Sequence, residues 1–120
     1  MTAVVGPNGS GKSTLVRALI GRVPLMRGGI AVDGASVASL GRKTLARRVA
    51  VVTQREELAF PLHVAEYVAL GRFPHLGLWH AATDEDARAV DASIEAAGVA
   101  DVRDRAVDTL SGGELQRVRL

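Results

Sequence analysis

A glycine-rich run at residues 6–13 reads Gly-Pro-Asn-Gly-Ser-Gly-Lys-Ser and follows a short apolar stretch. Gly, four residues, Gly, Lys and then Ser or Thr is the pattern of a phosphate-binding loop. Glycines let successive backbone N–H groups converge on an anion with no Cβ in the way, and the start of a following helix adds partial positive charge. We therefore expect Lys12 to reach the β- and γ-phosphates of a nucleotide and the Ser13 hydroxyl to hold Mg²⁺.

The alternative for this run is a glycine-rich turn with an exposed lysine. The position of the run, between an apolar stretch and a helical pattern, disfavours that alternative. Lysine is also rare here, because Lys12 and Lys43 are the only two in the chain. Arginine supplies the other positive charges, so a lysine in the loop indicates that a compact point charge is needed there.

The composition is that of an ordinary globular chain, and it excludes disordered and disulfide-stapled classes. Its 120 residues, enough for one domain, are 48% hydrophobic and 23% charged and include no cysteine. The formal net charge is +2 and no run concentrates it, so we expect no nucleic-acid partner. No apolar stretch reaches the roughly 18 residues of a membrane span, and the first residues show no basic region followed by an apolar one. We therefore expect a cytoplasmic protein.

Three short apolar runs in the first half have the character of β-strands, and each precedes turn or polar residues. They are residues 2–5, 30–32 and 49–53. A helix is expected over residues 12–20, with Gly21 ending it. Strand, glycine-rich loop and helix in this order begin an α/β unit, so the fold class is expected to be α/β.

After residue 54 the apolar spacing becomes helical. One such segment, residues 64–69, precedes Gly71. A second helix is better marked, because Thr83 can cap it, acidic residues at 84–86 suit its positive end, and Gly98 can close it. Residues 56–108 are therefore predicted to form a helical insertion.

A second glycine motif lies at residues 110–115, Leu-Ser-Gly-Gly-Glu-Leu. Ser111 and Glu114 have the spacing of a capping box, and Leu110 can pack against Leu115. This helix start does not explain Gly112 and Gly113, each of which costs about 1 kcal/mol relative to alanine in a helix. A bare first turn is useful where an anion approaches the backbone N–H groups.

Together these motifs resemble the nucleotide-binding domain of ABC transporters. Gln54 matches the Q-loop of that family, residues 110–116 match its signature motif, and residues 6–14 match its Walker A loop. The matching loop comprises Gly6, Pro7, Asn8, Gly9, Ser10, Gly11, Lys12, Ser13 and Thr14. The resemblance implies a P-loop NTPase core with a helical subdomain inserted after the Q-loop strand. It assigns residues 1–55 to the core, 56–108 to the helical subdomain and 109–120 to the signature motif and its helix.

The resemblance also implies ligands and partners. In the family, two domains sandwich two ATP molecules, and the signature of one faces the γ-phosphate held by the Walker A loop of the other. Ser111, Gly112, Gly113 and Glu114 are then expected to contact the ATP of a second copy. Gln54 is expected to approach Mg²⁺ and the attacking water and to sense a transmembrane permease.

Several parts of the family pattern do not occur in these 120 residues. They are an apolar strand ending in Asp-Glu after the signature, a later switch histidine and an aromatic residue before the first strand. Asp33-Gly34 is a poor substitute for the missing Asp, because Asp-Gly favours a tight turn. Asp84-Glu85 does not replace the missing Asp-Glu pair either, because it precedes the signature. We expect the chain to be truncated at both ends, with hydrolysis a property of a longer protein.

The segment at residues 68–77 is similar to import ATPases for iron-siderophores, heme and cobalamin. This similarity implies the ATP-binding subunit of an importer, held at the inner face of the cell membrane through its permease. His63, His75 and His80 are interpreted as surface residues and not as metal ligands, since their spacing offers no pair on one helical face. Two alternatives are a soluble ABC-type ATPase that does not act in transport and an inactive truncated product.

Overall fold

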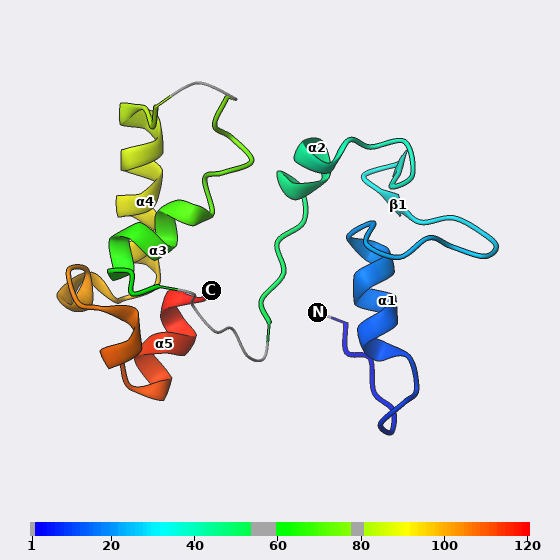
Figure 1. The fold of residues 1–120 in the computed structure, drawn as a ribbon, viewed down its shortest axis with the longest axis horizontal. Helices are drawn as coiled ribbons and strands as arrows, with labels where there is room; N and C mark the ends of the chain where they lie inside the picture. The colour runs from blue at the N-terminus through cyan, green and yellow to red at the C-terminus, as the bar shows by residue number, and fades with distance from the viewer. Residues whose placement is uncertain (1, 54–59, 78–80) are drawn as a thin grey trace. The chain divides into compact units, whose positions relative to one another are not determined.

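A computed structural model describes residues 2–53, 60–77 and 81–120 (Figure 1). The chain divides into two compact units, Met1–Ala50 (unit 1) and Val51–Leu120 (unit 2). The elements of unit 1 are α1 (Lys12–Leu19), β1 (Ala31–Val32), β2 (Ala35–Ser36) and α2 (Arg42–Ala46). Those of unit 2 are α3 (Val64–Leu70), α4 (Asp84–Ala96), the short 3-10 helices η1 (Ala100–Val102) and η2 (Val107–Thr109), and α5 (Gly112–Val118).

Helix α1 agrees with the helix predicted over residues 12–20. Gly21 ends it with a φ of +69°, a conformation that glycine adopts without steric cost. The N–H of Gly21 donates to the carbonyl oxygen of Ala18, and that of Arg22 donates to Arg17. These two bonds form a Schellman motif, which satisfies carbonyl groups that the helix leaves without partners.

Strands β1 and β2 form an antiparallel hairpin in which Val32 pairs with Ala35. The turn between them is Asp33-Gly34, with φ values of +49° and +76°. Positive φ at both central residues is the requirement of a type I′ turn, which matches the twist of the flanking strands. The strand predicted at 30–32 and the tight turn predicted at Asp33-Gly34 are therefore confirmed.

The strands predicted at residues 2–5 and 49–53 are wrong for the structure as described. Neither segment pairs with a neighbour as a strand, and Val5 is 89% exposed. A strand is stabilised by hydrogen bonds to a neighbouring strand, and among the described residues the only sheet is β1 with β2. Apolar character alone does not supply that neighbour. The α/β fold class is thus seen here as helices with one small sheet.

Helix α2 lies in unit 1, and the sequence patterns did not predict it. Its five residues include Leu45, which is buried, as are Ala18 and Val37 elsewhere in unit 1. Burial of Leu45 holds this helix, because so short a helix has little stability of its own.

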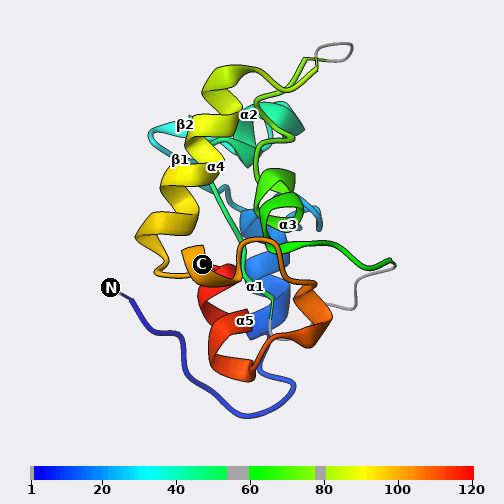
Figure 2. The same ribbon diagram turned by 90° about the vertical axis from the view of Figure 1, so that its left-hand side faces the viewer.

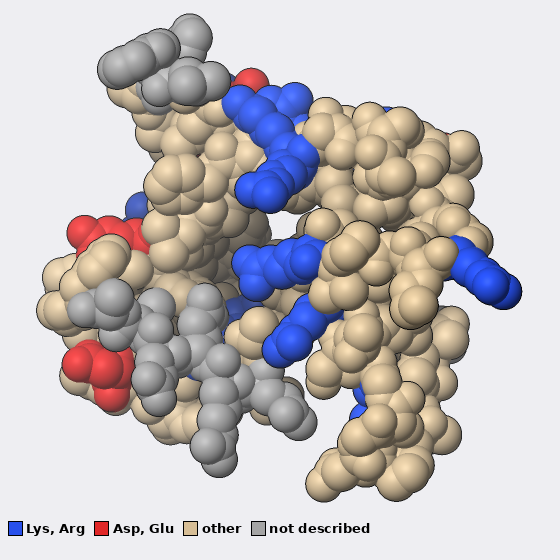
Figure 3. Space-filling view, turned by 45° about the vertical axis from the view of Figure 1, so that its right-hand side comes forward, with Lys and Arg blue, Asp and Glu red and all other residues tan. Residues whose placement is uncertain are grey.

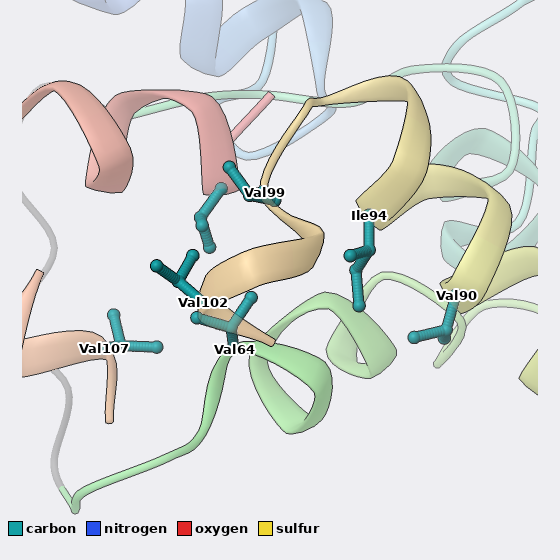
Figure 4. Packing of buried hydrophobic residues seen from close by; sticks show 7 residues of the cluster. Val64, Val90, Ile94, Val99, Val102 and Val107 are labelled. Atoms are coloured by element: carbon teal, nitrogen blue, oxygen red, sulfur yellow. The ribbon is translucent and has the colours of Figure 1, made fainter. Parts of the chain in front are cut away.

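The core of unit 2 gathers side chains from α3, α4, α5 and the two 3-10 helices (Figure 4). Its buried members are Val64, Val90, Ile94, Val99, Val102, Val107 and Val118. Leu110 and Leu115 both pack against this cluster, as expected for side chains that flank a helix start. Helices α3 and α4 run side by side (Figures 1 and 2).

Helix α4 begins and ends as the sequence predicts. The hydroxyl oxygen of Thr83 accepts a hydrogen bond from the N–H of Asp86, and Oδ2 of Asp86 accepts from the N–H of Thr83 at 3.0 Å. Gly98 has a φ of +63°, and the N–H of Val99 donates to the carbonyl oxygen of Ile94. This is again a Schellman motif, and its two apolar residues, Ile94 and Val99, are buried together.

A strand-like pairing joins the start of α3 to the segment that leads into η2. Val107 donates its N–H to Leu62, and Val64 donates to Arg105. His63 and Ala106 form an antiparallel bridge between these bonds. Residues more than 40 positions apart in the sequence are thereby fixed to each other by backbone hydrogen bonds.

Candidate functional site

The phosphate-loop motif forms a tight turn ahead of α1 (Figure 1). The ammonium group of Lys12 folds back over it, with Nζ donating to the carbonyl oxygens of Gly6 at 2.7 Å and Pro7 at 2.8 Å. A third donation reaches Oγ of Ser10 at 3.3 Å. These bonds hold a positive charge at the loop with no carboxylate in contact among the described residues, which suits an anionic ligand.

The loop depends on glycine at specific positions. Gly9 and Gly11 have φ values of +82° and +91°, which other residues rarely adopt. No described atom lies within 4 Å of a Cβ built at either position, so neighbouring atoms leave this space open. At Gly6 a Cβ would lie 2.7 Å from Oγ and 3.2 Å from Cβ of Ser10, so a side chain at this position would require Ser10 to shift.

The start of α1 leaves backbone donors without a side-chain cap. Its N-cap is Gly11, which makes no side-chain hydrogen bond, and Ser13 and Thr14 are exposed in the first turn. The N–H groups of a first helical turn have no partners within the helix. Together with the Lys12 ammonium group, this arrangement fits a nucleotide phosphate, and the Ser13 hydroxyl is available to a divalent cation.

Unit 1 is strongly basic in composition. Residues 1–50 contain eight Lys or Arg side chains and one acidic side chain, Asp33. Basic groups are also the more numerous charges on the face shown in Figure 3. The small net charge of the whole chain conceals this excess, because residues 51–120 are acidic on balance. The field of unit 1 favours an anionic ligand at its loop.

The second glycine motif starts α5 with a reciprocal capping box. The N–H of Ser111 donates to Oε2 of Glu114 at 2.7 Å, and the N–H of Glu114 donates to Oγ of Ser111 at 3.3 Å. These bonds with Ser111 are the main reason that the pKa of Glu114 lies below its usual range. Glu114 is therefore a carboxylate at neutral pH.

Gly112 and Gly113 are exposed in the first turn of α5. Apart from its chain neighbours and the adjacent backbone of its own helix, a Cβ built at either position meets no described atom within 4 Å. Packing among the described residues therefore gives no reason for glycine here.

Arg105 supports this motif, and its role was not predicted from the sequence. One terminal nitrogen, Nη2, donates to the carbonyl oxygen of Thr109 at 2.7 Å, and Nη1 lies 3.4 Å from Oε1 of Glu114. An arginine among alternating acidic residues gives no local signal of such contacts. Only the fold of residues 103–114 reveals them.

A groove of about 450 Å³ lies between α3 and α4. Its walls are mainly apolar, with Leu70, Phe73 and Val90 among them. Two ion pairs lie along it, Arg72 with Asp86 and Arg103 with Asp91. Arginines from other segments thus pair with one carboxylate at the start of α4, Asp86, and with one in its middle, Asp91.

The other predicted site residues are placed as follows. Gln54 and His80 lie outside the described residues. His63 is exposed at the start of α3, where its N–H donates to Oε2 of Glu66 at 2.8 Å, and His75 is exposed beyond the helix. The phosphate loop belongs to unit 1 and the second glycine motif to unit 2.

None of the helices in residues 2–53, 60–77 and 81–120 is both long and apolar enough to cross a bilayer.

A glycine-rich loop with a lysine folded over it, followed later in the chain by a capped glycine turn, is the pattern of a class of nucleotide-binding proteins. The family model described as ABC transporter matches residues 1–120, and the chain belongs to this family.

Relatives among characterised proteins include several import ATPases. The chain is 40% identical over 116 residues to the ferric enterobactin transport ATP-binding protein FepC of Escherichia coli. This match covers 97% of this chain and 43% of FepC. It is 42% identical over 120 residues to the cobalamin import ATP-binding protein BtuD of Halobacterium salinarum, covering 100% of this chain and 30% of that one. The hemin import ATP-binding protein HmuV of Nocardia farcinica is also 42% identical, with 100% and 41% covered. The chain thus spans less than half the length of these relatives.

A solved structure shares the fold. It is an ABC transporter of the type assigned to metal chelates, in an inward-facing conformation, and it matches with a TM-score of 0.76 and 24% identity. The match covers 96% of this chain and 41% of that one.

Proposed function

We propose that this chain carries the ATP-binding part of an ABC importer subunit, with MgATP held at Gly6–Thr14. The observation that carries the proposal is the Lys12 ammonium group, seated over a loop whose Gly9 and Gly11 adopt positive φ. Membership of the ABC transporter family supports the choice of ATP as the nucleotide.

Each loop residue has a role that follows from its chemistry. Lys12 exchanges its bonds to Gly6 and Pro7 for bonds to the β- and γ-phosphates. Ser13 offers its hydroxyl to Mg²⁺, and the N–H groups of the first turn of α1, Thr14 included, bind phosphate oxygens. Mg²⁺, when bound, neutralises charge that develops on the phosphates.

The second site acts on a second copy of the protein. Ser111, Gly112, Gly113 and Glu114 face the ATP held by the other copy, so that two nucleotides lie between two domains. The open space beside Gly112 and Gly113 supports this role, because packing within the chain does not require either glycine. Gln54 belongs to the same proposal as a ligand of Mg²⁺ and a contact to the attacking water.

The transported compound is proposed to be an iron-siderophore, heme or cobalamin. Support comes from relatives that are 40% and 42% identical and are named for the transport of ferric enterobactin, cobalamin and hemin. The subunit then works at the inner face of the cell membrane, bound to transmembrane permease subunits. A soluble ABC-type ATPase without a permease remains the alternative.

Hydrolysis requires groups that these 120 residues do not contain, since no Asp-Glu pair follows the signature motif. Binding of ATP and hydrolysis of ATP are therefore separate questions. If the chain binds no nucleotide at all, the alternative of an inactive truncated product applies.

The test is nucleotide binding, measured with a fluorescent ATP analogue and Mg²⁺. Lys12→Ala removes a charge-assisted contact to phosphate, so the Kd should rise about 10- to 100-fold. Lys43→Ala, at the only other lysine, is the matched control and should leave the Kd unchanged. Equal binding by wild type and Lys12→Ala contradicts the proposed site, and circular dichroism shows whether each variant is folded.

A further inference from the structure

Arg105 is the point where three segments of unit 2 meet. Its guanidinium group contacts the carbonyl oxygen of Thr109, at the end of η2, and the carboxylate of Glu114. Its own carbonyl oxygen accepts the N–H of Val64, the first residue of α3. One residue thus connects the start of α3 with both sides of the turn that precedes α5.

The carboxylate of Glu114 poses an electrostatic problem at this turn. Its Oε2 is occupied by the N–H of Ser111, and its Oε1 faces Arg105. Without a cation beside it, this negative charge would repel a phosphate that approaches Ser111 and Gly113. The guanidinium of Arg105 contacts Oε1 and, together with the charge of Arg117, offsets that negative charge. The bond to Ser111 is left intact.

We propose that Arg105 is a positioning residue for ATP hydrolysis. It orients the Ser111–Glu114 turn and offsets the negative charge of Glu114, which would otherwise repel the phosphate of the ATP bound to a second copy. The inference rests on the proposed function, because it needs the turn to face a nucleotide. Arg105 does not itself touch the nucleotide, and its effect passes through Glu114 and Thr109.

A purely structural role for Arg105 predicts that its loss lowers the melting temperature, whereas a positioning role does not. The side chain of Arg105 is 47% exposed, and an exposed ion pair contributes little to stability. Loss of the guanidinium should therefore leave the melting temperature nearly unchanged. Its effect on activity should depend on the charge of Glu114.

The experiment measures ATPase kinetics and melting temperature in the full-length protein for Arg105→Gln, Arg105→Lys and the double variant Arg105→Gln/Glu114→Gln. A displaced contact in an active site can lower turnover up to about 100-fold, and we expect kcat of Arg105→Gln to fall about 10-fold. The KM for ATP should change less, because the Walker A loop is intact. Arg105→Lys keeps the charge and should recover part of the loss, and so should the double variant.

Arg103→Gln is the matched control, since Arg103 is a comparably exposed arginine paired with Asp91, and its kcat should stay at the wild-type value. An unchanged kcat for Arg105→Gln overturns the proposal. So does a loss that Glu114→Gln fails to relieve, because that result assigns Arg105 a structural role only. Lys12→Ala separates the two hypotheses: if it binds ATP as the wild type does, the proposed function itself has failed.

Discussion

Arg72 and Asp86 are 14 residues apart, and Nε of Arg72 donates to Oδ1 of Asp86 at 2.8 Å. The same carboxylate accepts from the N–H and the hydroxyl of Thr83 through Oδ2. Asp86 therefore ties the segment after α3 to the start of α4. It is also a buried charged residue with all its bonds inside unit 2.

This arrangement predicts a loss of stability in acid. The N–H of Thr83 and then Arg72 lower the pKa of Asp86 from 3.8 to about 2. A lowered pKa in the folded state means that the carboxylate stabilises the fold above about pH 4, and that this contribution disappears as the pH falls toward 2. Melting temperatures of wild type and Asp86→Asn should differ at pH 6 and converge between pH 4 and 2. A constant difference across that range would argue against the assigned role.

A core substitution in unit 2 should be strongly destabilising. Ile94 is 2% exposed and packs among valines from four other segments. Ile94→Ala should lower the free energy of unfolding of this unit by about 2–5 kcal/mol, through lost burial and the cavity left behind. Val16→Ala, at a side chain that is 43% exposed, is the control and should cost far less. Chemical denaturation followed by circular dichroism measures both.

The two units should not unfold in one cooperative step. Unit 1 buries only three apolar side chains among its described residues, Ala18, Val37 and Leu45, whereas the core cluster of unit 2 has seven. Fewer buried contacts mean a smaller free energy of local opening. Hydrogen exchange should therefore be faster in α1 and α2 than in α4. A single sharp thermal transition with equal protection in both units would contradict this expectation.

Gly113→Ala should separate the local role of the second motif from its functional role. Alanine favours a helix relative to glycine, and an added Cβ meets no described atom within 4 Å, so the melting temperature should not fall. In the full-length protein the added methyl should nevertheless lower ATP hydrolysis while nucleotide affinity stays the same. Ser111→Ala, which removes the cap, should instead cost about 1 kcal/mol of stability. A stable Gly113→Ala protein with wild-type hydrolysis would leave the motif as a helix start only.

Features fixed by neighbouring residues were determined by the sequence. The caps at Thr83 and Ser111, the type I′ turn at Asp33-Gly34 and the ends of α1 and α4 at Gly21 and Gly98 all depend on bonds that span five residues or fewer. Their partners are adjacent in the chain, so residue type and spacing were sufficient to predict them. The glycines that shape the phosphate loop belong to the same group.

Contacts between distant residues were decided by the tertiary structure. The sequence could not show that residues 62–65 pair with residues 103–107, that Arg72 reaches Asp86, or that Arg105 reaches Glu114. For the same reason the apolar runs at 2–5 and 49–53 were predicted as strands, although a strand forms only where another segment offers its hydrogen bonds. Sequence patterns describe what a segment can do locally, and only the fold determines which partner it meets.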